Sequence, residues 1–275
     1  MHIDSFFACA NSELKDAEFV IVGIPYDSTQ SFKSGSRFAP NAIREASWNL
    51  ETYSLHFNFN LDFAKICDAG NINVDGGFDK VIKNTESFIK NLDSQTLITL
   101  GGEHTISYAV VKALNRLDLC YVVFDAHLDL RDKFDDNPYS HACTIRRIFE
   151  LGIDKIVIIG ARSGTEEELI FAKENGIEVY YSWDFDLSKI ERSIHDSLIY
   201  LSIDMDVFDP AFAPGVSTPE PFGLNPIVML KFFEKFSKRI LAMDVVEVIP
   251  DTEKITQTLA AKLIFEFISS KNLNQ

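Results

Sequence analysis

Short apolar runs rich in β-branched residues recur along the chain, separated by segments with helical character. They occupy residues 18–25, 64–70, 96–102, 119–127, 155–161, 177–182, 198–206 and 240–248. The apolar character of each run is nearly continuous rather than alternating, which is typical of strands that are covered on both faces. The pattern therefore predicts an α/β fold with a broad, mainly parallel, eight-stranded sheet.

Helices are predicted in the segments between these runs, near residues 40–50, 78–92, 105–116, 141–151, 165–175, 225–238 and 252–270. Two of them have recognisable starts. Thr165 followed by Glu168 has the form of a capping box, and Asn225 followed by Pro226 resembles an N-cap with proline at the first helical position. The sequence contains no repeat, low-complexity stretch or linker, so we expect one domain.

Composition narrows the classes of partner. The chain has 41 acidic and 26 basic residues, and this excess of negative charge disfavours nucleic acid and anionic membrane surfaces while mildly favouring cationic ligands. Neither a membrane-spanning run nor a secretory signal is recognisable. The cysteines, Cys9, Cys67, Cys120 and Cys143, are scattered singly, which favours free thiols in a reducing compartment. We therefore expect a cytoplasmic protein.

Polar side chains gather where four of the apolar runs end, in the stretches GGEHT (101–105), DAHLD (125–129), DMD (204–206) and VVEV (245–248). Ligands of parallel sheets bind at the carboxyl ends of the strands, so function is expected there. Asp125, His127 and Asp129 would point to one side if the strand continued through them. Asp204 and Asp206 repeat this spacing after another strand.

His104 follows Gly101 and Gly102, whose lack of side chains allows a turn that brings the imidazole towards neighbouring strands. Four aspartates converging in a buried crevice would repel one another unless a cation held them, which indicates a divalent metal site. Carboxylate and imidazole ligands without thiolate favour Mn(II) and are compatible with iron, cobalt or zinc. Two histidines and four aspartates are more ligands than one ion usually takes, so two ions are expected.

The same stretches carry a family resemblance. GGEHT, DAHLD and SIDMDVFDPAFAPGVSTPEP (202–221) resemble the signature stretches of the ureohydrolase family, which includes arginases and agmatinases. Residues 23–54 and DVVEVIP (244–250) resemble its agmatinase-like branch. The resemblance spans about residues 20–250, and it implies a three-layer arginase-like fold with a single ureohydrolase catalytic domain over residues 1–275.

The resemblance also implies two Mn²⁺ ions per subunit, held by six side chains: His104, Asp125, His127, Asp129, Asp204 and Asp206. Of these, Asp125 and Asp204 would bridge the ions. Members of the family keep a hydroxide between the two metals, and two cations acidify bound water towards neutrality. This hydroxide would attack the guanidinium carbon of the substrate.

Three residues are expected to take part in catalysis, namely the ligand Asp129 together with Glu247 and His141. Glu247 occupies the position of the family's substrate-binding acid and would pair with the guanidinium in a bidentate fork. With it, the formal charges of two Mn²⁺, a hydroxide and four aspartates sum to a negative site, which fits a small cationic guanidino substrate. His141, in YSHACT, would be the family's proton-shuttling and substrate-binding histidine, although the family usually has His-Gly here.

The loop that follows DAHLD indicates which guanidino compound is the substrate. Arginases surround the amino-acid end of their substrate with an Asn, Thr and Ser-rich loop, whereas this chain reads RDKFDDNPYS over residues 131–140. The aspartates of this loop, Asp132, Asp135 and Asp136, favour a substrate that ends in an amine, and the acidic run 166–168 offers either an amine contact or a helix first turn. Agmatine, hydrolysed to putrescine and urea in polyamine biosynthesis, is the expected substrate. Aminopropylagmatine, guanidinobutyrate and arginine are alternatives.

The ligand set disfavours two other classes of protein. A deacetylase-like amide hydrolase would be expected to hold a single zinc with fewer ligands, which His104 and the second Asp pair argue against. A non-catalytic metal-binding or scaffold homologue usually loses a ligand or the substrate acid, whereas the six ligands and Glu247 are all present. The resemblance implies a homotrimer or homohexamer.

Overall fold

The computed structural model describes residues 5–153 and 155–272. Residues 1–4, 154 and 273–275 lie outside the described part, so the start of the N-terminal segment, where a secretory signal would lie, is not described. The eight predicted strands are β1 (Phe19–Gly23), β4 (Ile66–Asn71), β5 (Thr96–Leu100), β6 (Leu119–Phe124), β7 (Lys155–Ala161), β8 (Glu178–Tyr181), β9 (Leu198–Asp204) and β10 (Ile240–Val246). They form one sheet in the order β4-β1-β5-β10-β9-β6-β7-β8, with every neighbouring pair parallel. The predicted α/β class and eight-stranded parallel sheet are therefore confirmed.

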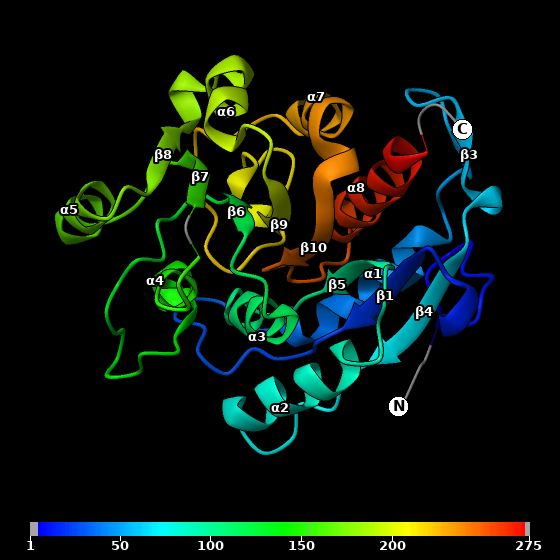
Figure 1. Ribbon diagram of the computed structural model, residues 1–275, viewed down its shortest axis with the longest axis horizontal. Coiled ribbons are helices and arrows are strands. Elements are labelled where there is room, and N and C mark those ends of the chain that lie inside the picture. Colours follow the sequence, from blue (N-terminus) through cyan, green and yellow to red (C-terminus); the bar gives the residue numbers. More distant parts are fainter. Residues whose placement is uncertain (1–4, 154, 273–275) are drawn as a thin grey trace.

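Helices cover both faces of the sheet and give the molecule three layers (Figure 1). One face packs against α1 (Ala39–Ser47), α6 (Leu187–Ile194), α7 (Ile227–Phe236) and α8 (Ile255–Lys271). The other face packs against α2 (Phe78–Ile89), α3 (Thr105–Leu114), α4 (Thr144–Phe149) and α5 (Glu166–Glu174). Within the described residues, no helix combines the length and apolar character that crossing a bilayer requires.

Strand β6 shows why the apolar runs are continuous. All six of its residues are buried, because alternate side chains enter different cores. Cys120, Val122 and Phe124 belong to one core, and Leu119, Tyr121 and Val123 to the other. With helices on both faces, none of the β6 positions reaches solvent, so charged residues begin only where this strand ends.

The helix starts agree with the sequence signals to within a residue. Thr165 and Glu168 form the predicted capping box at the start of α5. In α7, however, Pro226 occupies the N-cap and the helix begins at Ile227, one residue later than expected. The Asn225 side chain still accepts a hydrogen bond from the Ile227 backbone N–H at 3.0 Å, so it caps the turn from one position further out.

Some elements were not predicted. Helix α6 spans only eight residues, too few for isolated stability, and is secured by the Asp186 side chain at its N-cap and by burial of Ile190 and Ile194. Two-residue strands β2 (Tyr53–Ser54) and β3 (Phe59–Asn60) form a small antiparallel pair outside the main sheet.

The predicted strands that lead into the polar stretches run too far. Strand β6 ends at Phe124, so Asp125, His127 and Asp129 lie in a loop rather than on one side of a strand. The aspartates themselves turn the chain: Asp125 Oδ1 accepts the His127 N–H at 2.6 Å, and Asp204 Oδ1 accepts the Asp206 N–H at 2.9 Å. Such side-chain-to-backbone bonds compete with strand pairing and favour a turn.

Candidate metal centre and active site

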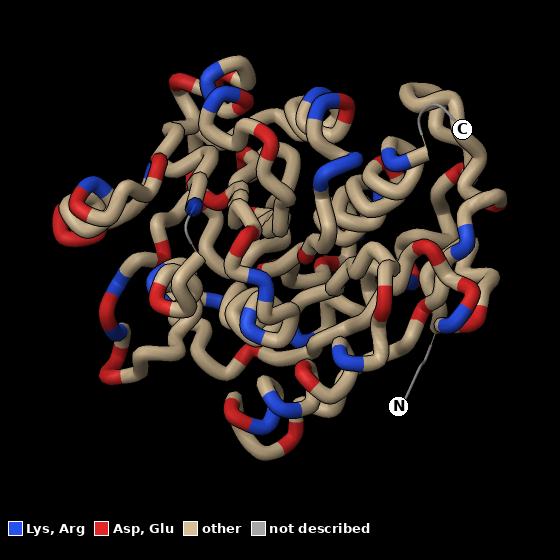
Figure 2. The backbone as a smooth tube through the Cα atoms, in the orientation of Figure 1, with Lys and Arg blue, Asp and Glu red and all other residues tan. Residues whose placement is uncertain are grey.

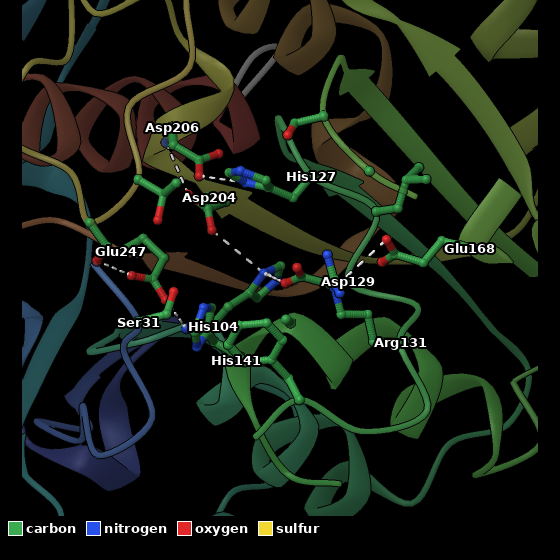
Figure 3. Close-up of a pocket in the computed structure, with 17 residues that line it drawn as sticks. Ser31, His104, His127, Asp129, Arg131, His141, Glu168, Asp204, Asp206 and Glu247 are labelled. Carbon is green, nitrogen blue, oxygen red and sulfur yellow. Dashed lines mark hydrogen bonds and ion pairs between the residues drawn. The ribbon is translucent and has the colours of Figure 1, made fainter. Parts of the chain in front are cut away.

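The strand order gathers the predicted site residues at one edge of the sheet. Strands β5, β10, β9 and β6 are consecutive neighbours, and the chain leaves their carboxyl ends through His104, Glu247, Asp204 and Asp125. A cavity of about 190 Å³ opens at this edge. Its walls include all the predicted site residues except Asp125, which is fully buried beside them. Figure 3 shows their side chains converging on this space.

His104 reaches the cavity because Gly102 lets two loops touch. A Cβ on Gly102 would lie 2.0 Å from the carbonyl oxygen of Tyr26, and the next residue, Glu103, donates its backbone N–H to that same oxygen at 2.8 Å. The backbone N–H of His104 donates to Glu247 Oε1 at 2.6 Å. The tight passage between β5 and α3 therefore places the imidazole where the sequence predicted.

The Nδ1 atom of His104 faces three carboxylates. It lies 3.1 Å from Asp125 Oδ2 and 2.9 Å from Asp129 Oδ2. Its distance to Asp204 Oδ2 is 3.5 Å. Asp129 adopts a left-handed backbone conformation, with φ of 44°, that turns its carboxylate back towards this group. One ring nitrogen carries at most one proton and cannot satisfy three acceptors.

A second group of ligands surrounds His127. Its Nδ1 lies 2.9 Å from Asp206 Oδ2 and 3.6 Å from Asp125 Oδ1. The side chains therefore form two triplets that could each hold a metal ion, His104–Asp125–Asp204 and Asp125–His127–Asp206, with ligand atoms within 4.8 Å of one another. Asp125 belongs to both triplets, as expected of a bridging ligand, whereas Asp204 belongs to one.

The buried nitrogen and oxygen atoms of the cluster are better suited to binding divalent cations than to pairing with one another. Among the described residues, His104 Nδ1 and Asp125 Oδ2 are buried without a hydrogen-bond partner. Burial, together with the neighbouring Asp206 and Asp125 carboxylates, raises the pKa of Asp204 well above its usual range. The same causes, burial and then Asp125, raise the pKa of Asp129 to about 6. The carboxylate oxygens and imidazole nitrogens repel or leave one another unpaired without a cation. Together they form a suitable site for two metal ions.

Polar groups lie beside the outer nitrogen of each imidazole. The His104 Nε2 atom lies 3.2 Å from the Ser202 hydroxyl, which donates to Asp244 at 2.6 Å. On the other side, His127 Nε2 lies 3.7 Å from Glu220. Both rings therefore present Nδ1 to the cavity and Nε2 to polar groups of the protein, the arrangement that orients metal-binding histidines.

Glu247 is held on the cavity wall by several donors. It is 3% exposed, and its backbone is left-handed, with φ of 63°. The Gln30 amide donates to its Oε2 at 2.7 Å, the Ser217 hydroxyl donates to the same oxygen, and the His104 N–H binds Oε1. Sequence reasoning assigned no role to Gln30, although it lies in a stretch that resembles the family. The sequence feature that could have indicated Gln30 is its position in the loop after β1, because β1 lies beside β5 in the sheet.

His141 also lines the cavity and lies at the start of a 3₁₀ turn (His141–Cys143) that leads into α4. Its backbone N–H donates to the Thr29 hydroxyl at 2.9 Å, and its Nδ1 lies 3.2 Å from that oxygen. Thr29 is a second residue that sequence reasoning missed, and it too comes from the loop after β1. The structure thus brings His141 and the ligand set to one cavity.

The aspartates of the loop expected to meet an amine tail do not line this cavity. Asp132 is exposed and pairs with Arg147, and Asp136 pairs with Lys133. The loop residues on the cavity wall are instead Arg131 and Phe134. Asp132, Asp135 and Asp136 do not line the cavity, so these side chains give no support for an amine-ended substrate.

Comparisons with known proteins agree with this geometry. The sequence model of the arginase family matches residues 17–269. An agmatinase from Pyrococcus horikoshii is 40% identical over 265 residues, which cover 93% of each chain. An N(1)-aminopropylagmatine ureohydrolase from Thermococcus kodakarensis is 40% identical over 270 residues, covering 94% of this chain and 92% of the relative.

A solved structure confirms the fold. The agmatine ureohydrolase of Thermoplasma volcanium superposes with a TM-score of 0.91 at 36% identity, covering 98% of this chain and 95% of the other. The three-layer arrangement is therefore the predicted arginase-like one. With its sheet, its ligand sets and its relatives in agreement, the chain belongs to the arginase family and is an agmatinase-like ureohydrolase.

Proposed function

We propose that this ureohydrolase cleaves agmatine to putrescine and urea with two Mn²⁺ ions per subunit. The observation that carries the proposal is the position of Glu247, a buried carboxylate on the wall of a cavity that also contains the aspartate cluster. A planar guanidinium cation can donate two parallel hydrogen bonds to such a carboxylate. The cluster's remaining negative charge favours the same cation.

The ions would be held by the six predicted ligands, His104, Asp125, His127, Asp129, Asp204 and Asp206. When bound, the pair of cations supplies a water acidified enough to act as a nucleophile at neutral pH. Glu247 orients the guanidinium so that its carbon faces the ligand cluster. His141, across the cavity, donates a proton to the amine that leaves when the C–N bond breaks.

Two other guanidino substrates have specific support. The relative named as an aminopropylagmatine ureohydrolase is as similar as the agmatinase, so a longer amine tail is a candidate. Arg131 favours guanidinobutyrate instead, because its side chain is partly exposed on the cavity wall and its 3.9 Å contact with Glu168 is too long for a hydrogen bond, which leaves the guanidinium able to bind a substrate carboxylate. Arginine would place both an ammonium and a carboxylate near this residue.

Urea release from each of the four compounds, measured with the purified protein and Mn²⁺, tests the proposal. We expect kcat/KM for agmatine to exceed that for arginine by at least about tenfold, which corresponds to roughly 1.4 kcal/mol. Glu247→Gln should abolish most turnover while keeping the metal. A protein that binds two metal ions and releases urea from none of the compounds would instead be a scaffold homologue, and one with a single zinc would be an amide hydrolase.

We infer one catalytic domain over residues 1–275 and a homotrimer or homohexamer, which light scattering of the purified protein would test. The four unpaired cysteines support a cytoplasmic location. Acidic and basic residues are mixed along the outer helices in Figure 2, so the excess negative charge is spread over the molecule rather than gathered on one helix.

A further inference from the structure

The loop after β1 connects the catalytic histidine to a buried carboxylate outside the ligand set. Glu103, fully buried, accepts two hydrogen bonds from Thr29, one from its backbone N–H at 2.7 Å and one from its hydroxyl at 2.9 Å. The same hydroxyl oxygen accepts the backbone N–H of His141 and lies 3.2 Å from the ring Nδ1. Thr29 therefore lies between Glu103 and His141.

We propose that Thr29, locked by Glu103, is the positioning residue that fixes both the place and the tautomer of His141. This inference rests on the proposed role of His141 as proton donor. Thr29 has a single hydroxyl hydrogen, and it is directed to Glu103. The lone pairs of its oxygen are then left to accept the His141 backbone N–H and the Nδ1–H of the ring.

The position of the Nδ1 proton determines which nitrogen of the His141 ring can transfer a proton. With Nδ1 protonated and bound to Thr29, the second nitrogen, Nε2, is the one free to exchange a proton with the cavity. Within residues 5–153 and 155–272, the hydrogen-bond contacts of the ring all involve Nδ1, which faces the hydroxyl oxygens of Thr29 and, at 3.4 Å, of Ser140. In the donating form the ring carries a proton on both nitrogens; when the C–N bond breaks, the leaving nitrogen keeps the bond's electron pair and takes the proton from Nε2, which leaves a neutral ring with Nδ1–H still bound to Thr29. The Thr29 hydrogen does not move.

Thr29 is anchored through Glu103, which is itself held by the backbone of the fold. Its partner Glu103 immediately precedes His104, and the Glu103 N–H is tied to the Tyr26 carbonyl within the same loop. A shift of Thr29 would therefore disturb His141 first, because the other end of the contact is fixed between β5 and α3. The next residue, Gln30, holds Glu247 in the same way, so consecutive residues of one loop hold the proton donor and the substrate acid.

The test compares Thr29→Val, which removes the hydroxyl but keeps the shape, with Thr29→Ser, which keeps the hydroxyl. We expect Thr29→Val to lower kcat about 10- to 100-fold, with KM and metal content per subunit within about threefold of the wild type. Thr29→Ser should recover most of this loss. The matched control is Thr85→Val in α2, where a buried threonine hydroxyl has no hydrogen-bond partner among the described residues.

A double-mutant cycle separates positioning from a general structural effect. In a His141→Asn background, Thr29→Val should cause little further loss of kcat, because both changes act on one proton transfer. Full additivity, or wild-type kcat in Thr29→Val, would overturn the inference. A crystal structure of Thr29→Val does not depend on turnover and should show the His141 ring displaced. A ring that stays in place refutes the positioning role, whereas absence of urea release by the wild type refutes the proposed function instead.

Discussion

Aspartate side chains have two separate tasks at this site. In Asp125 and Asp204, one carboxylate oxygen accepts a backbone N–H two residues on and so makes the turn, while the other faces His104 Nδ1. The spacing of these motifs is therefore a property of a turn as much as of a ligand set. Asparagine could make the same turn but would not supply the charge that a divalent cation requires.

Asp206→Asn tests this division of tasks. Its Oδ1 accepts the Ala126 N–H at 3.1 Å, a bond that asparagine can keep, while its Oδ2 faces His127. We expect a folded protein that binds one metal ion instead of two and turns over roughly 100-fold more slowly or worse, since even changes to residues behind metal ligands cost about 10- to 100-fold. Elemental analysis and urea release measure both effects. Two ions per subunit in this variant would contradict the ligand assignment.

The buried pair Arg44–Asp68 is a second residue-scale feature. Arg44 of α1 donates to both oxygens of Asp68 of β4, at 2.8 and 2.9 Å, and to the Gly70 carbonyl at 3.0 Å. Asp68→Ala should lower the free energy of unfolding by about 3–5 kcal/mol, because it leaves a buried guanidinium unpaired. Denaturant unfolding would measure this. The double variant Arg44→Met/Asp68→Leu should be more stable than Asp68→Ala, and an equal or larger loss would show that packing dominates.

At the scale of elements, helix α5 shows how a local signal becomes part of the site. Glu168 completes the capping box with Thr165 and also accepts the Leu130 N–H at 3.0 Å, just after the DAHLD motif. The helix start therefore holds the loop that carries His127 and Asp129. Glu168 lines the cavity, and its oxygens accept hydrogen bonds from three donors of the protein.

Thr165→Ala should destabilise the protein by about 1 kcal/mol, the usual cost of losing an N-cap. Thr165→Ser keeps the cap and is the control. Glu168→Ala should cost more and should also weaken metal binding, because it releases the Leu130 N–H. Thermal unfolding and Mn²⁺ titration distinguish the two effects, and equal metal affinity in both alanine variants would argue against the loop contact.

At the scale of the whole molecule, the fold brings together carboxylates that repel one another and that bound cations would hold. Chelation of the metal should therefore lower Tm. At a Mn²⁺ concentration about 100 times Kd, binding adds about 2.7 kcal/mol to the folded state. For a chain of this size, that is a shift of roughly 5–10 °C. Scanning calorimetry with EDTA and after Mn²⁺ is restored measures it, and an unchanged Tm after proven metal loss would disprove a shared ion site.

Much of the fold followed from the sequence because it depends on local patterns. Continuous apolar runs indicated strands covered on both faces, and the capping box at Thr165 marked its helix correctly. Helix α6 was missed because it is short and is stabilised by the burial of Ile190 and Ile194. Strand ends were placed too late because Asp125 turns the chain with its own side chain.

The sequence by itself determined which groups can do the chemistry, since the histidines, aspartates and Glu247 are recognisable by type and spacing after apolar strands. The tertiary structure alone decided which of them meet, because the order β5-β10-β9-β6 joins strands that are far apart along the chain. It also decided which neighbours hold them, through contacts of Thr29 and Gln30 across 112 and 217 positions of sequence. Such contacts leave no local pattern, because the loop after β1 needs no periodicity to reach its partners.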